Sequence, residues 1–136
     1  LAQLERIDEF VSKRRSNAKL YNSLLSELEG KVILPPEAPW AKSVYWMYCI
    51  LIGNEFGVGR DELVEELKTM GIETRTFFIP MHRQPAFHKL GVFNDENYPI
   101  ADEIAQKGLY LPSGVNLTDE QINYISSAIK EIGVRK

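Results

Sequence analysis

The 136-residue sequence is long enough for one domain with a sizeable core, and its 44% hydrophobic and 26% charged residues are typical of a soluble globular protein. The net charge of −3, with both signs interspersed, excludes the clustered basic face of a nucleic-acid-binding protein, and no apolar stretch approaches the roughly 20 residues of a membrane span. Cys49 is the only cysteine, which excludes a disulfide framework and indicates a reducing, cytoplasmic compartment.

Apolar residues at helical spacing predict a long first helix over residues 1–30, with Gly30 as its stop. The apolar positions are Leu4, Ile7, Phe10, Val11, Ala18, Tyr21, Leu24, Leu25 and Leu28. The pattern starts in mid-helix and without a methionine, so we interpret the chain as a fragment of a longer protein. One end of this helix is then expected to pack on a part outside the chain. Three prolines make residues 31–43 an extended connector.

Residues 43–52, SVYWMYCILI, predict a strand that is central or covered on both faces, with Trp46 and Tyr48 in the core. The glycines of residues 53–59 mark a plain loop, because they lack both the dinucleotide spacing and the Lys–Ser/Thr pair of a phosphate-binding motif. A second helix is predicted over residues 61–70, ending at a glycine.

Residues 72–79 predict a buried second strand that ends at Pro80, and the apolar residues from Phe87 to Phe93 predict a flap. A third helix is expected from Pro99 to Gly108. Its predicted buried side consists of Ile100, Ala101, Ile104 and Ala105.

Residues 109–111 predict a short third strand, and Thr118 with Gln121 predicts a capping box at the start of the last helix. That helix is expected to bury Ile122, Ile125, Ile129 and Ile132. The order of elements predicts an α+β fold with about three strands and helices packed on the sheet.

The tetrapeptide Met81-His82-Arg83-Gln84 lies between two prolines at the end of a predicted strand. A donor-rich turn of this kind suits an anionic or polyhydroxylated ligand. The alternative is a surface turn whose polar side chains are merely solvated. His82 and His88 have no third ligand residue nearby, so we predict no metal site.

Several blocks occur in an order that is specific as a set: LAQLERIDEFVSKRRSNAKLYNSLL, LPPE before an aromatic strand, GIETRTFFIPMHRQPAF, and PIADEIAQKGLYLPSG followed by LTDEQI. Together they resemble the C-terminal portion of the DegT/DnrJ-type sugar-nucleotide aminotransferases. These are pyridoxal-phosphate enzymes of the aspartate-aminotransferase fold (fold type I). The resemblance covers essentially the whole chain, and the VYWMY strand looks most like the perosamine-synthetase branch.

The resemblance implies a single C-terminal small domain of a longer enzyme, with residues 1–30 as a connecting helix and residues 31–136 as the α+β sheet domain. The N-terminal cofactor domain, with the pyridoxal phosphate and its Schiff-base lysine, would lie outside this chain. We therefore expect no catalytic residue and no bound cofactor here, and no transamination by the fragment alone. The implied reaction of the full-length enzyme moves an amino group from glutamate to a 4-keto-6-deoxy sugar nucleotide, GDP-linked in the perosamine-like version. The implied assembly is a homodimer.

What the resemblance leaves to this domain is closure over the active site and contact with the sugar nucleotide. His82 matches the histidine of the family's P-x-H-x-Q-P element at residues 80–85, and could hydrogen-bond a sugar hydroxyl or a diphosphate oxygen. Arg83, Gln84 and Arg75 complete the predicted substrate-binding set, the arginines through bidentate contacts to phosphate. For each arginine a surface ion pair is the alternative. A loop histidine packs little, so replacement of His82 is expected to change stability only slightly.

Two other functions remain open at this stage. One is a free-standing, catalytically silent α+β module that binds a small anion with the same loop. The other is a pyridoxal-phosphate-dependent sugar dehydratase of the same family, in which a histidine replaces the cofactor lysine at a position outside this chain. The residues that precede Leu1 in the full reading frame would separate these alternatives.

Overall fold

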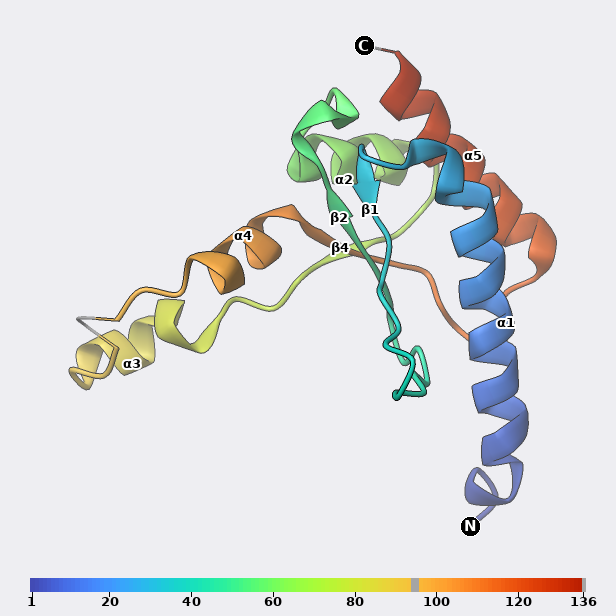
Figure 1. Ribbon diagram of the computed structural model, residues 1–136, viewed down its shortest axis with the longest axis horizontal. Coiled ribbons are helices and arrows are strands. Elements are labelled where there is room, and N and C mark those ends of the chain that lie inside the picture. Colours follow the sequence, from blue (N-terminus) through green and yellow to red (C-terminus); the bar gives the residue numbers. More distant parts are fainter. Residues whose placement is uncertain (94–95, 136) are drawn as a thin grey trace.

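A computed structural model of the chain describes residues 1–93 and 96–135 (Figure 1). Within these residues four strands form one antiparallel sheet in the order β1-β2-β4-β3. The strands are β1 Val32–Ile33, β2 Tyr48–Ile52, β3 Arg75–Thr76 and β4 Gly108–Leu111. The helices are α1 Ile7–Leu25, α2 Arg60–Thr69, α3 Pro85–Lys89, α4 Pro99–Lys107 and α5 Asp119–Val134. Short 3₁₀ turns lie at Leu4–Arg6, Ser26–Leu28, Asn54–Phe56 and Met81–Arg83.

The hydrophobic core lies between the sheet and helices α1, α2 and α5, and Figure 1 shows α1 and α5 side by side. The ring of Tyr21 in α1 stacks on that of Tyr48 in β2, with the ring centroids 4.6 Å apart. Helix α5 buries the four isoleucines that the sequence predicted, and its capping box is present. Thr118 Oγ1 accepts from the Gln121 amide, and Gln121 Oε1 accepts from the Thr118 amide. The predictions for this helix are confirmed.

The sheet has one strand more than predicted, the first two predicted strands are shorter, and the third is present as Gly108–Leu111. Strand β1 lies within the predicted connector, where Val32 pairs with Ile52 across the sheet. Of residues 43–52 only Tyr48–Ile52 pair, because the chain turns before them: Tyr45 has φ +44°, and Arg14 donates to the carbonyls of Tyr45 and Trp46. Trp46 is 64% exposed, so its predicted place in the core is wrong, whereas Tyr48 is buried as predicted.

The second predicted strand is largely wrong. Of residues 72–79 only Arg75–Thr76 form a strand, β3, and it lies at the edge of the sheet, paired with β4 alone. Phe78 and Ile79 are exposed, not buried. An edge strand has no neighbour on its second side, and Pro80 ends the segment that could have extended it.

Residues 77–93 and 96–107, which we call the arm, project away from the sheet and carry α3 and α4 (Figure 1). The arm is held at its base by Phe77, whose ring stacks on Tyr110 at 4.5 Å, and by Arg60, which donates to the carbonyl of Gly108 at 3.0 Å. The prediction that one side of α4 is buried is wrong: Ile100 is 69% exposed and no residue of α4 is buried. Ile104 is 38% exposed, and only Ala101 and Ala105 on that side are half-buried.

Candidate substrate-binding site

The carboxylate of Asp102 gathers two of the predicted substrate-binding residues. Asp102 lies in the first turn of α4, and His82 and Arg83 lie in the Met81–Arg83 turn on the other limb of the arm. Asp102 Oδ1 accepts from His82 Nε2 at 2.8 Å and from Arg83 Nε at 2.8 Å, while Oδ2 accepts from Arg83 Nη2 at 2.5 Å. One carboxylate therefore fixes both side chains.

The arginine and the histidine set the ionisation of this carboxylate. The hydrogen bond from Arg83, followed by that from His82, lowers the pKa of Asp102 to about 2, so the group is a carboxylate at neutral pH. A carboxylate only accepts hydrogen bonds, so Nε2 of His82 carries a proton, and in the neutral tautomer of the ring Nδ1 is an acceptor.

His82 is buried, with 8% of its surface exposed, and its ring packs against the Tyr98 ring at a centroid distance of 4.8 Å. This corrects the view of His82 as a loop residue with little packing. We now expect its replacement to destabilise the arm, because Asp102 would lose one hydrogen-bond donor and Tyr98 one packing partner.

Arg83 presents the accessible part of the cluster, since 55% of its side chain is exposed. Its Nε and Nη2 form the bidentate pair with Asp102, and Nη1 has no hydrogen bond within the described residues. Gln84 is used within the loop instead: its Nε2 donates to the Ile79 carbonyl at 3.1 Å, which closes the turn. The P-x-H-x-Q-P element thus contains one structural amide and two residues that converge on Asp102.

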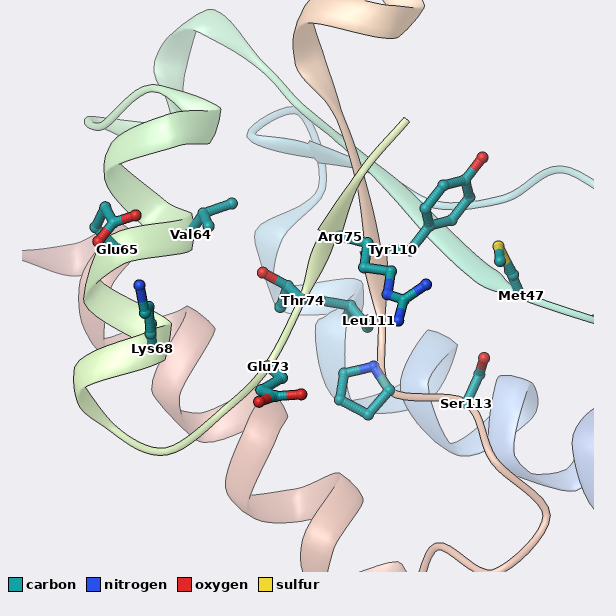
Figure 2. Close-up of a pocket in the computed structure, with 11 residues that line it drawn as sticks. Met47, Val64, Glu65, Lys68, Glu73, Thr74, Arg75, Tyr110, Leu111 and Ser113 are labelled. Atoms are coloured by element: carbon teal, nitrogen blue, oxygen red, sulfur yellow. The ribbon is translucent and has the colours of Figure 1, made fainter. Parts of the chain in front are cut away.

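Arg75, the fourth predicted residue, lies in β3 and lines a separate hollow of about 490 Å³ (Figure 2). Figure 2 shows its guanidinium extending toward Met47 and Ser113, and it has no hydrogen bond or ion pair within the described residues. Lys68, Glu65 and Glu73 also line this hollow, so its charges are mixed. The structure brings together His82 and Arg83 but places Arg75 elsewhere.

Asp102 and Tyr98 were missed by sequence reasoning. An acidic residue in the first turn of a helix is ordinarily explained by the helix dipole, which gives no reason to suspect a partner 20 residues earlier. The usable signal was the proline at position 99, which fixes the start of α4 and hence the side on which residue 102 emerges.

The exposure of the chain's lysines bears on the pyridoxal-phosphate cofactor that the sequence resemblance implies. A Schiff-base lysine needs a desolvated slot with an acidic group for the ring nitrogen nearby. Every lysine in the described part of the chain is at least partly exposed. Within residues 1–93 and 96–135 there is also no cluster of three potential metal ligands, and no helix long and apolar enough to cross a bilayer.

Comparison with known proteins places the fold and the arm in context. Residues 1–130 match the profile of the DegT/DnrJ/EryC1/StrS aminotransferase family. The chain is 33% identical over 132 residues to the GDP-perosamine synthase of Caulobacter vibrioides, covering 97% of this chain and 35% of that protein. It is also 33% identical over 130 residues to the dTDP-4-amino-4,6-dideoxy-D-glucose transaminase of Escherichia coli, covering 95% of this chain and 35% of that protein.

Among solved structures, S. venezuelae DesV in complex with a ketimine intermediate superposes with a TM-score of 0.87 at 29% identity, over 99% of this chain and 35% of DesV. Fold and sequence together place the chain in an aminotransferase family, with the predicted aspartate-aminotransferase-like fold. The chain belongs to the DegT/DnrJ/EryC1/StrS aminotransferase family, as the order of its sequence blocks indicated. It spans about a third of the length of these relatives.

Proposed function

We propose that this chain is the C-terminal small domain of a nucleotide-sugar aminotransferase that moves the amino group of glutamate to a 4-keto-6-deoxy sugar nucleotide. Residues 1–30 serve as the connecting helix and residues 31–136 as the sheet domain. The observation that carries the proposal is the family match over residues 1–130 together with 33% identity to a GDP-perosamine synthase. The full-length enzyme is a cytoplasmic homodimer in this proposal.

The nucleotide is the less constrained part of the substrate. Relatives named for a GDP-linked and for a dTDP-linked sugar match this chain at the same 33% identity. The aromatic VYWMY segment favours the GDP-linked substrate of the perosamine-synthetase branch. We therefore take the GDP-linked keto sugar as the first substrate to test and the dTDP-linked sugar as the second.

Within the arm, residues 80–85 are the part of this chain that binds the sugar nucleotide. Arg83 has exposed donors that suit a diphosphate oxygen, and Nδ1 of His82 can accept a hydrogen bond from a sugar hydroxyl. Gln84 supports the turn from within the loop. Arg75 would bind a second anionic group from its own hollow, separate from the arm.

The cofactor chemistry belongs to the remainder of the enzyme in this proposal. Pyridoxal phosphate, when bound there, supplies the carrier for the amino group, and this chain contributes binding and orientation of the keto sugar. The 136 residues purified alone should therefore neither bind the cofactor covalently nor transaminate.

The test is product analysis with the full-length enzyme and ¹⁵N-glutamate. The expected product from the GDP-linked 4-keto-6-deoxy sugar is an amino sugar that carries ¹⁵N, with 2-oxoglutarate formed in equal amount. A dehydratase of the same family would instead give a sugar that has lost a hydroxyl group and contains no ¹⁵N. No conversion of either the GDP-linked or the dTDP-linked keto sugar would favour the non-catalytic binding module.

A further inference from the structure

Asp102, on the second limb of the arm, is hydrogen-bonded to both His82 and Arg83 on the first limb. It lies 20 residues after His82 and 19 after Arg83, and its side chain is only 14% exposed. All three hydrogen bonds of its side chain go to these two neighbours, two on Oδ1 and one on Oδ2. With three hydrogen bonds to its neighbours and little exposed surface, the carboxylate is engaged mainly by the protein.

We propose that Asp102 is a positioning residue, which orients Arg83 and His82 for the sugar nucleotide without touching it. The inference rests on the proposed function, because it assigns a role within that same binding site. It concerns the unused donors and acceptors of the pair, namely Nη1 of Arg83 and Nδ1 of His82.

The geometry explains why a carboxylate at this position matters. A free arginine side chain samples many rotamers, and a ligand that binds it must order them. The bidentate contact with Asp102 fixes the plane of the guanidinium beforehand, so that the remaining nitrogen, Nη1, is held in a defined position. The same carboxylate fixes the tautomer of His82, which determines whether Nδ1 meets the ligand as an acceptor.

The charge balance makes the inference testable against a purely electrostatic explanation. Arg83 and Asp102 neutralise each other, so the cluster recognises its ligand through directed hydrogen bonds more than through net charge. Replacement of Asp102 by asparagine adds one positive charge to the site. If net charge dominated, this variant would bind a diphosphate more tightly, whereas loss of orientation weakens binding.

The first experiment measures binding of GDP-mannose, a non-reacting analogue, to the full-length enzyme by calorimetry. Asp102→Asn is expected to raise Kd about 10- to 100-fold, the range that loss of a hydrogen bond to a charged group produces. Asp102→Glu keeps the charge and both acceptor oxygens and should recover most of the affinity. The control is Glu103→Gln, a neighbouring carboxylate of α4 that pairs with Lys107 at 2.7 Å, and its Kd should stay within about twofold of wild type.

A second variant leaves Asp102 intact and so does not depend on how well the asparagine variant folds. Arg83→Lys keeps the positive charge, but an ammonium group cannot form the bidentate pair and also hold a further donor in a defined position. We expect Arg83→Lys to lose nearly as much affinity as Arg83→Ala. A lysine variant with wild-type Kd would overturn the inference, as would an Asp102→Asn enzyme that binds GDP-mannose as tightly as wild type or tighter.

Kinetics separate positioning from a merely structural role. In the Asp102→Asn enzyme KM for the keto sugar should rise while the glutamate half-reaction stays within about twofold of wild type. Equal losses in both half-reactions would mean a structural role and overturn the inference. Wild-type enzyme that binds GDP-mannose but forms no amino sugar would contradict the proposed function alone, since the Kd comparison still tests Asp102. Wild-type enzyme that does neither contradicts both.

Discussion

The ring of Phe77 lies directly against the α-carbon of Gly108, so that a Cβ added to Gly108 would come within 2.3 Å of the ring. The contact joins the two limbs of the arm at their base, next to the stack of Phe77 on Tyr110. Gly108→Ala should therefore lower the free energy of unfolding by about 1–3 kcal/mol, the usual cost of overpacking. Denaturant unfolding monitored by circular dichroism measures it.

The double variant Phe77→Ala/Gly108→Ala tests whether the ring of Phe77 causes the loss of stability in Gly108→Ala. Phe77→Ala removes the ring that the new methyl group would meet, so Gly108→Ala should cost much less in this background, with a coupling of about 0.5–3 kcal/mol. Additive losses would show that the glycine is needed for another reason.

The capping box of α5 gives a second stability prediction. Thr118→Ala removes the side-chain acceptor for the Gln121 amide and should cost about 0.5–2 kcal/mol. Ser127→Ala is the matched control, because Ser127 is exposed in the same helix and alanine is the better helix former. It should leave stability unchanged or slightly higher, and a Thr118→Ala protein that behaves like this control would contradict the assignment of the cap.

Acid should weaken the arm through Asp102. Its pKa in the folded protein, about 2, is below the usual value of about 3.9 for an unfolded chain, so the unfolded state binds more protons between these values. The stabilisation from the carboxylate is thus present above about pH 4 and is lost as the pH falls toward 2. The stability difference between wild type and Asp102→Asn should be constant above pH 4 and narrow below it. Thermal unfolding of both proteins over this pH range measures the difference in stability. A difference that stays the same down to pH 2 would refute the link between Asp102 ionisation and stability.

The isolated chain should self-associate. Leu4, Ile7 and Trp46 are large exposed hydrophobic residues, and a groove of about 520 Å³ lies between the start of α1 and the segment around Trp46. Exposed apolar surface of this extent is typical of an interaction face. Light scattering over a concentration series should show oligomers that diminish in a Trp46→Ser variant. A monomer at every concentration would count against this prediction.

The sequence predicted best those elements whose burial is decided by local periodicity. Helices α2 and α5 follow the apolar spacing, with Leu63, Leu67 and Ile129 buried and the cap of α5 formed as expected. The same reasoning failed where the surroundings decide burial. The apolar side of α4 is exposed at Ile100 because the arm projects beyond the sheet, and sequence periodicity cannot tell what covers a helix.

The candidate site was predictable only in part, for a related reason. His82, Arg83 and Gln84 could be found because they are adjacent in a proline-bounded element. The partner of the first two, Asp102, lies 20 residues from His82 in another helix, and only the tertiary structure brings it near. The sequence also did not indicate that the predicted residues lie in two separate places. Arg75 is close to residues 80–85 along the chain, yet it lines a hollow away from the cluster around Asp102.

The most direct test of the central claim is stopped-flow measurement of the two half-reactions of the full-length enzyme with His82→Ala. Loss of a neutral hydrogen bond costs about 0.5–1.5 kcal/mol and of a charged one about 1.5–3 kcal/mol. We therefore predict that kcat/KM for the keto sugar falls about 3- to 100-fold. The glutamate half-reaction should be unaffected, because amino-group loading does not require the arm. Ser127→Ala, at an exposed position of α5 outside the arm, is the control and should leave both half-reactions near wild type. Equal losses in the two half-reactions of His82→Ala, or no loss in either, would contradict the assignment of the arm to the sugar nucleotide.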